Sequence, residues 1–161
     1  MDNAQPSLLS GMELRPAFVL LDLEADSNMQ VLTALSDRLF EEGMVKSTFR
    51  SAILKREEEY CTGLAFPEMG IALPHTDKDH VISPCIAIGV LRKPVTFQSM
   101  GMPEIPCETE MVFMLAIKDP EAQLNFLQTC MQIFQEPGKL SALKACKTAE
   151  ELTTLFKSYF A

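Results

Sequence analysis

The chain has 161 residues, 47% of them hydrophobic and 22% charged, which fits one globular domain with a hydrophobic core. Its 14 basic and 22 acidic residues give a net charge of −8, which argues against nucleic acid as a partner because phosphate backbones require clustered Lys and Arg. No apolar run approaches the roughly 18 residues of a membrane span, and residues 1–15 lack a signal-peptide pattern, so a cytoplasmic location is expected.

The N-terminal half is expected to hold one strand and two helices. Residues 17–23 form an apolar run that predicts a strand. Ser27 is the expected N-cap of a helix that ends at Gly43, and a second helix is expected to start at Ser47 and to run into the charged segment 55–59. The core-facing positions expected for the first helix are Val31, Leu32, Leu35, Leu39 and Phe40.

The centre of the chain is expected to be rich in strands. Short apolar runs at residues 70–73, 85–91 and 111–117 predict buried strands, and residues 95–97 predict a shorter one. Residues 100–107 contain one glycine and two prolines and are therefore expected to form a loop.

The C-terminal part is expected to be helical. Asp119 followed by Pro120 predicts the start of a helix, a short helix is expected after Pro137, and Thr148 with Glu151 three residues later forms a capping box for the last helix. The expected core-facing residues are Leu124, Leu127, Met131 and Phe134 in the first of these helices, and Leu152, Leu155, Phe156 and Tyr159 in the last.

These elements together predict an α/β fold. We expect a single-domain layered sandwich, with a mixed β-sheet of about four or five strands flanked by helices. The weakly patterned segment 1–12 is expected to be loosely ordered, which leaves 13–161 as the domain.

The five cysteines are odd in number and form no CxxC pair, so neither a disulfide framework nor a zinc knuckle is indicated. Cys85 and Cys130 lie in apolar segments and are expected to be core residues. Cys61, five residues after Arg56, is a weak candidate for a reactive thiol.

The two histidines of the chain lie in one short segment. His75 directly follows a predicted strand and Pro74, so its imidazole is presented at a strand end on a rigid base, where a neutral imidazole suits nucleophilic attack on phosphorus. Two other interpretations remain open, a polar loop histidine and a metal site. The metal site would use His75, Asp77, Asp79 and His80.

The segment from Arg56 to Thr62-Gly63, followed by Gly-Ile-Ala-Leu-Pro-His at 70–75, resembles the enzyme IIA domains of the fructose–mannitol class of the bacterial sugar phosphotransferase system. The resemblance covers nearly the whole chain and implies the fold of those domains. His75 lies 19 positions after Arg56, and this spacing and the second histidine at position 80 are similar to the galactitol type within that class.

The resemblance implies roles for individual residues. His75 would be the phosphorylated histidine, with the phosphoryl group on Nε2, and Arg56 would stabilise the phosphoryl charge. Thr62 would hydrogen bond the His75 ring or the phosphoryl group. Gln123 stands nearest to the place where mannitol- and fructose-type domains carry a second active-site histidine, and His80 is either a supporting residue or a solvated loop residue.

The resemblance also implies a function and partners. The chain would accept a phosphoryl group from phospho-HPr and pass it to a cysteine of enzyme IIB, which serves the membrane enzyme IIC, with no cofactor and no metal. Apolar residues near the histidine, among them Phe66, Met69 and Met100, would form the docking surface. Two alternatives remain open, a regulatory enzyme IIA-like protein that signals its phosphorylation state, and a metal-binding hydrolase.

Overall fold

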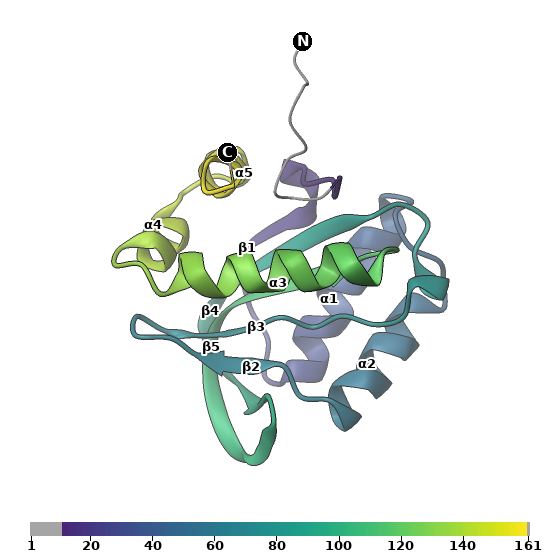
Figure 1. Cartoon of the computed structure of the whole chain (residues 1–161), viewed down its shortest axis with the longest axis horizontal. Helices are drawn as coiled ribbons and strands as arrows, with labels where there is room; N and C mark the ends of the chain where they lie inside the picture. Colours follow the sequence, from purple (N-terminus) through teal and green to yellow (C-terminus); the bar gives the residue numbers. More distant parts are fainter. Residues whose placement is uncertain (1–10, 161) are drawn as a thin grey trace.

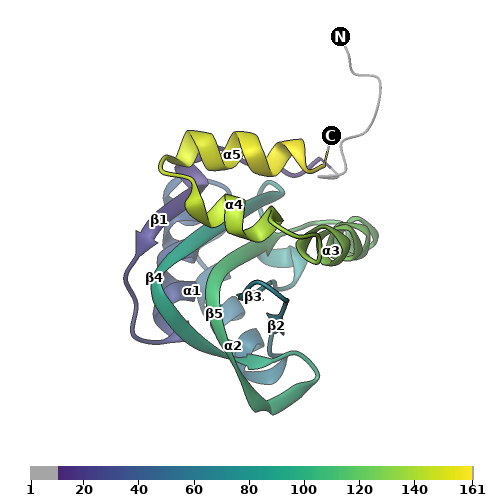
Figure 2. The same ribbon diagram turned by 90° about the vertical axis from the view of Figure 1, so that its left-hand side faces the viewer.

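The computed structural model describes residues 11–160, and its central feature is one mixed five-stranded sheet with helices on both faces (Figures 1 and 2). The strands are β1 (Val19–Leu23), β2 (Gly63–Ala65), β3 (Gly70–Ala72), β4 (Cys85–Ser99) and β5 (Met102–Ala116). The α-helices are α1 (Asn28–Glu41), α2 (Phe49–Glu59), α3 (Pro120–Phe134), α4 (Lys139–Ala145) and α5 (Ala149–Ser158). Two short 3₁₀ helices are η1 (Pro16–Phe18) and η2 (Lys78–His80). The predicted α/β class is confirmed.

The sheet is organised around the antiparallel pair β4–β5. β1 runs parallel to β4, β3 runs parallel to β5, and the small strand β2 pairs antiparallel with β3. β2 also meets β4 at one point, where Gly63 lies opposite Ser99. β2 had no counterpart among the predicted strands, because Leu64 is its one large apolar side chain and no apolar run marks it.

Side chains of β5 alternate between two helical layers. The Phe113 ring lies 4.9 Å from the Phe134 ring of α3 and 5.6 Å from the Phe156 ring of α5. The next residue, Met114, points the other way and accepts a hydrogen bond from Ser36 of α1 at 3.8 Å. Because successive strand residues face opposite sides, the sheet is the middle layer of an α/β/α sandwich. Figures 1 and 2 show α1 and α2 on one side of it and α3, α4 and α5 on the other.

The prediction of a loop at residues 100–107 is wrong. β4 and β5 instead continue as a long hairpin that projects at the bottom of Figure 1, with Ser99 opposite Met102 and Phe97 opposite Cys107. β3 pairs with β5 only from Thr109 onward, so the outer edge of residues 102–106 is unpaired. Proline is tolerated on such an edge because no ladder partner there needs its N–H.

The helix starts follow the prediction closely. Ser27 Oγ accepts a hydrogen bond from Gln30 N–H at 3.2 Å, and Gly43 has a φ of 76° just after α1. Asp119 and Thr148 cap α3 and α5 in the same way. α2 begins at Phe49, two residues later than expected.

The predictions of which helix residues face the core are less accurate. Phe40 and Leu124, expected in the core, are 52% and 56% exposed, and Met131 is also exposed. On α3 the buried face is rotated because aromatic packing selects it, with Phe126 stacked on Phe160 at 5.2 Å. The buried residues of α3 are Phe126, Cys130, Ile133 and Phe134.

At the start of the described chain, Met12 is buried in the core, although it falls in the segment expected to be loosely ordered. Residues 1–10 of that segment lie outside the described residues. Within residues 11–160, every helix is too short or too polar to cross a bilayer.

Two glycines of the segment 56–75, Gly63 and Gly70, are required by close backbone packing. A Cβ at Gly70 would overlap the Glu108 carbonyl oxygen, and a Cβ at Gly63 would lie 2.8 Å from the Gln98 carbonyl oxygen. Both glycines lie where the β2–β3 hairpin packs against the long β4–β5 hairpin, so they allow that close approach.

We expect Gly70→Ala to lower the free energy of unfolding by about 2 kcal/mol, because a backbone oxygen cannot move aside without breaking the sheet. Gly89→Ala is the matched control, since its Cβ would meet only leucine methyl groups at 3.4–3.5 Å. Urea unfolding of both variants measures the difference. Equal stability of the two variants would contradict this account of Gly70.

Candidate functional site

A cavity of about 380 Å³ brings together three of the predicted site residues. Arg56 comes from the last turn of α2, His75 from the segment after β3, and Gln123 from the first turn of α3. The lining residues are Arg56, His75, Thr76, Asp77, Lys78, Asp79, Ile117, Pro120 and Gln123. Thr62 and His80 are not among them.

The backbone holds His75 at the end of β3. Pro74 C=O accepts a hydrogen bond from Leu115 N–H at 2.9 Å, and His75 lies opposite Leu115 in an isolated parallel bridge. The β3–β5 pairing is thereby extended beyond the last residue of β3. The imidazole is presented on a paired and rigid segment, as the position after Pro74 predicts.

The His75 ring is oriented by a backbone carbonyl. Its Nδ1 lies 2.9 Å from the Leu73 carbonyl oxygen. Because a carbonyl oxygen can only accept, Nδ1 must carry the proton in this pair. The lone pair of a neutral ring is then on Nε2, which is the nitrogen available for nucleophilic attack.

The environment of His75 favours the neutral ring. Burial lowers its pKa most, the hydrogen bond to Leu73 raises it, and the charge of Arg56 lowers it further. The net direction is downward from the ordinary value for histidine. A ring that stays neutral keeps the Nε2 lone pair that a nucleophile needs.

Arg56 has donor capacity that its protein neighbours do not use. Its guanidinium lies 4.5 Å from the centre of the Tyr60 ring, and its Nη1 is 3.8 Å from Asp77 Oδ1. The ion pair is weak because Asp77 is 71% exposed. Within the described part of the chain, the buried Arg56 Nε has no hydrogen-bond partner. A planar fork with free N–H groups at the edge of a cavity suits a phosphoryl group or a carboxylate.

Thr62 lies apart from the cavity and is bound to Glu57. Its hydroxyl donates to Glu57 Oε1 at 2.8 Å, and its backbone N–H donates to Oε2 at 2.9 Å. The expected hydrogen bond from Thr62 to the His75 ring is not found among residues 11–160, where the ring Nδ1 is paired with Leu73. The structure therefore places Thr62 behind the site.

Glu57 was not predicted as a site residue, because it stands in a run of charged residues at a helix end. It is only 3% exposed, and burial raises its pKa to about 7 against the lowering effect of the two Thr62 hydrogen bonds. The signal that could have found it is helical spacing, since Phe49, Ile53 and Glu57 follow one another at intervals of four on the buried face of α2.

His80 does not line the cavity that holds His75. Its Nδ1 lies 2.8 Å from Thr48 Oγ1, and its C=O accepts a hydrogen bond from Lys46 N–H at 2.9 Å, which ties η2 to the segment before α2. Within residues 11–160, no three His, Cys, Asp or Glu side chains are grouped as a metal site requires, and this includes the cluster at 75–80.

The structure also tests the predictions for the cysteines and for the apolar residues near His75. Cys85 and Cys130 are buried as expected, but burial and the charge of Glu57 raise the pKa of the Cys61 thiol, which disfavours a reactive thiolate. Of the three residues expected at the docking surface, Met69 is buried, Phe66 is half-buried and packs edge-on against Phe134 at 5.8 Å, and Met100 is 39% exposed.

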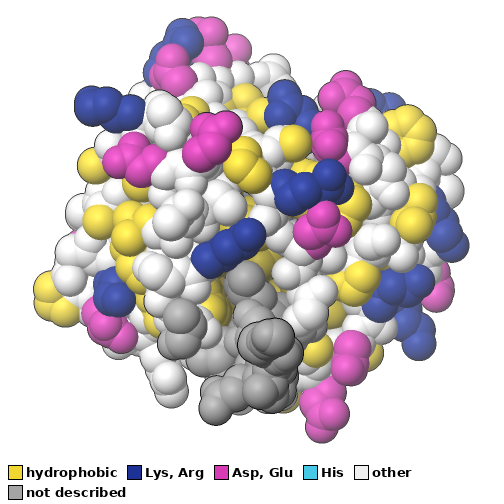
Figure 3. All heavy atoms as spheres, turned by 90° about the horizontal axis from the view of Figure 1, so that it is seen from above, with side chains coloured by type: hydrophobic (Ala, Val, Ile, Leu, Met, Phe, Trp, Pro, Cys, Tyr) yellow, Lys and Arg dark blue, Asp and Glu magenta, His cyan; other side chains and the backbone are white. Residues whose placement is uncertain are grey.

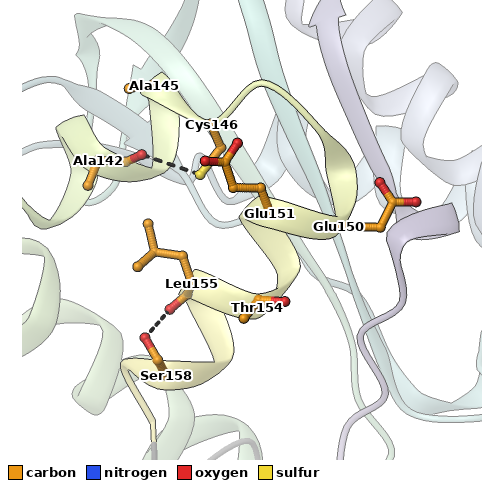
Figure 4. A pocket seen from close by; sticks show the side chains of 8 residues that line it. All are labelled: Ala142, Ala145, Cys146, Glu150, Glu151, Thr154, Leu155 and Ser158. Carbon is orange, nitrogen blue, oxygen red and sulfur yellow. Dashed lines mark hydrogen bonds between the residues drawn. The ribbon is translucent and has the colours of Figure 1, made fainter.

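A larger cavity of about 740 Å³ lies between α4 and α5 and holds none of the predicted site residues (Figure 4). Its one thiol, Cys146, is hydrogen bonded to the Ala142 carbonyl oxygen at 3.4 Å. The face of the molecule seen from above mixes acidic and basic side chains with hydrophobic ones (Figure 3). The side chains that suit phosphoryl chemistry, Arg56, His75 and Gln123, lie together in the smaller cavity.

We expect the His75 imidazole to protonate at a lower pH in the folded protein than in the protein unfolded in urea, because burial and Arg56 both lower its pKa. Two-dimensional ¹H–¹⁵N NMR of the ring nitrogens across a pH titration measures both midpoints. Arg56→Gln is expected to move the folded midpoint upward, since it removes the neighbouring charge. A folded midpoint at or above the unfolded one would contradict this description of the site.

Comparison of the sequence with known proteins gives consistent results. The family described as "Phosphoenolpyruvate-dependent sugar phosphotransferase system, EIIA 2" matches residues 13–159. The galactitol-specific EIIA component of the phosphotransferase system from Escherichia coli (strain K12) is 26% identical over 126 residues, which are 78% of this chain and 83% of that protein.

Comparison of the structure finds the same fold in solved proteins. The mannitol IIA crystal structure from Escherichia coli has a TM-score of 0.73 at 19% identity, over 89% of this chain and 99% of that one. The complex of mannitol IIA with phosphorylated IIB from Escherichia coli gives 0.75 at 18% identity, over 91% and 99%. The nitrogen regulatory protein IIA-Ntr from Neisseria meningitidis gives 0.67 at 22% identity, over 88% and 94%. With the match to residues 13–159, the chain belongs to the EIIA 2 family of the phosphoenolpyruvate-dependent sugar phosphotransferase system, a family of phosphocarrier components.

Proposed function

We propose that His75 accepts a phosphoryl group from phospho-HPr and passes it to a cysteine of a cognate enzyme IIB, in a galactitol-like sugar uptake system. The observation that carries the proposal is the His75 ring itself. Its Nδ1–H is committed to the Leu73 carbonyl, and it lies in one cavity with Arg56. The family supports a phosphocarrier role, and the 26% identical galactitol-specific relative supports the subtype.

The chemistry follows from this geometry. The Nε2 lone pair attacks phosphorus in line with the donor nitrogen, the new N–P bond forms, and the donor bond breaks with its electron pair returning to the donor ring. The proton stays on Nδ1, so the phosphorylated ring carries positive charge, which the Leu73 carbonyl oxygen stabilises. In the second step a cysteine thiolate attacks phosphorus and the Nε2–P bond breaks.

Charge on the phosphoryl oxygens is met by two side chains of the cavity. Arg56 lines the cavity and supplies positive charge. Gln123 supplies an amide N–H donor from the first turn of α3, although it adds no charge. The positive end of the α3 macrodipole lies on the same side of the cavity, because Pro120 at the first helical position also lines it.

The surface around the cavity is suited to brief contact with another protein. Tyr60, beside Arg56, is 61% exposed, and Leu124, beside Gln123, is 56% exposed. Exposed apolar side chains next to a reactive group favour transient docking. The mannitol relative of the same fold was solved in complex with phosphorylated IIB, which supports an enzyme IIB as the acceptor here.

A regulatory role is the alternative function. The nitrogen regulatory protein IIA-Ntr of Neisseria meningitidis shares the fold at 22% identity. The cavity geometry serves either role, because both begin with phosphorylation of the histidine. The test of the acceptor therefore separates them.

We expect wild-type protein incubated with enzyme I, HPr and phosphoenolpyruvate to acquire acid-labile phosphate, and His75→Ala to acquire none. His80→Ala is the matched control, since its ring lies outside the cavity and is expected to label like wild type. An unlabelled wild type, or equal labelling of His75→Ala, would refute the proposal. Transfer of the label to a galactitol-type enzyme IIB supports the transport role, and labelling without transfer to any IIB supports the regulatory one.

We expect Arg56→Gln to slow phosphoryl transfer by about 100-fold, because a preorganised charge near the phosphoryl oxygens is lost. Arg56→Lys should recover part of the rate, since it restores the charge but not the planar fork. Rapid-quench measurement of label transfer from phospho-HPr gives the rates. A rate for Arg56→Gln within a few-fold of wild type would show that Arg56 has no such role.

A further inference from the structure

We propose that Glu57 is a positioning residue for His75 and acts through a chain of hydrogen bonds that passes through Thr62 and Leu73. The chain joins the buried end of α2 to the imidazole. The effect on transfer rate rests on the proposed function, whereas the effect on the ring itself does not.

The first link fixes the polypeptide just after α2. Glu57 and Thr62 are 3% and 2% exposed, and the carboxyl group accepts from both the backbone N–H and the hydroxyl of Thr62. One side chain thus holds both donors of a residue five positions later. A buried group that loses these partners is left unsatisfied, which makes the link costly to break.

The second link passes from Thr62 to the site. Thr62 C=O accepts a hydrogen bond from Leu73 N–H at 3.2 Å, and Leu73 C=O accepts the hydrogen bond from His75 Nδ1–H at 2.9 Å. Both backbone polar groups of Leu73 are therefore used, one toward Thr62 and one toward the ring. The direction of the carbonyl that orients the imidazole depends on where Thr62 is held.

Leu73 is fixed on its other side independently of Glu57. The next residue, Pro74, has a restricted φ, and the Pro74 C=O accepts a hydrogen bond from Leu115 N–H of β5. The Leu73 carbonyl thus lies between two anchors, of which β5 is one and Glu57 with Thr62 is the other. Loss of the Glu57 anchor is expected to let this carbonyl move while the sheet remains intact.

The hydrogen bonds between Glu57 and Thr62 can form in both protonation states of Glu57. Burial raises the pKa of Glu57 to about 7, so both forms are present near neutrality. A charged carboxylate accepts both Thr62 hydrogen bonds, and a protonated carboxyl accepts one and donates the other to the Thr62 hydroxyl, which rotates to suit. Glutamine has the same donor and acceptor pattern as the protonated form. Glu57→Gln is therefore the conservative variant that should preserve the positioning.

The test compares Glu57→Leu, which removes both acceptors, with Glu57→Gln. NMR of the ring nitrogens, without any phosphoryl donor, reports the fraction of rings protonated at Nδ1 and the exchange of that proton with solvent. We expect Glu57→Leu to lose the protected Nδ1–H signal and to transfer phosphoryl groups about tenfold more slowly, since small misplacements of reacting groups are costly. Glu57→Gln should keep the signal and a rate within about twofold of wild type.

Ile53→Ala controls for general loss of stability. Ile53 is buried one turn earlier on the same helix face, so this variant weakens α2 but removes neither partner of the Glu57–Thr62 hydrogen bonds. We expect it to lower the melting temperature and to leave the Nδ1–H signal unchanged. If it abolishes the signal as Glu57→Leu does, the positioning role is overturned.

Two further outcomes would overturn the proposal. One is a folded Glu57→Leu with a wild-type Nδ1–H signal and transfer rate, and the other is a Glu57→Gln as defective as Glu57→Leu. Should Glu57→Leu not fold, Glu57→Asp replaces it, because its shorter side chain pulls Thr62 toward α2 or loses one hydrogen bond. An unchanged signal and rate in Glu57→Asp then count against the proposal. Failure of the proposed function would appear as an unlabelled wild type, and the NMR comparison does not depend on that result.

Discussion

The hydrogen bond from Leu115 N–H to Pro74 C=O determines where the site forms. It extends the parallel β3–β5 pairing past the end of β3, so His75 leaves the sheet opposite Leu115 of β5, a residue that lies only a few positions before the start of α3. Gln123 reaches the cavity for that reason, and α2 delivers Arg56 from the opposite layer. Three segments far apart in the sequence, which carry Arg56, His75 and Gln123, meet because the β3–β5 pairing continues by one residue pair.

The cavity combines effects on the charge of the His75 ring that act in opposite directions. Burial and a neighbouring Arg56 keep the His75 ring neutral and nucleophilic, while the Leu73 carbonyl favours the charged ring that phosphorylation creates. The same arginine that disfavours a protonated ring attracts a phosphoryl group. A half-buried position therefore serves the chemistry better than full exposure, where solvent would weaken all three effects.

Features encoded locally could be predicted from the sequence, and those decided by tertiary packing could not. The caps at Ser27 and Asp119 depend on neighbouring backbone groups, and His75 was found because a strand, a proline and a family-like pattern coincide around it. Leu124 fitted an apolar stripe, but aromatic packing chose another face of α3. Pro103 indicated a loop because the sequence does not show which strand edge is unpaired. Glu57 was hidden in a run of charged residues, and its burial depends on contacts with a different segment.

The orientation of His75 also bears on how this site tolerates mutation. Since the acceptor for Nδ1–H is a main-chain carbonyl, no single substitution deletes it, in contrast to a site that orients its histidine with a carboxylate. The two demands on residue 73 are separable, because its fully buried side chain fills the core while its backbone orients the ring. An apolar substitution at residue 73 therefore leaves the acceptor of the Nδ1–H group in place. The tautomer is sensitive instead to substitutions at the residues that set the path of the chain.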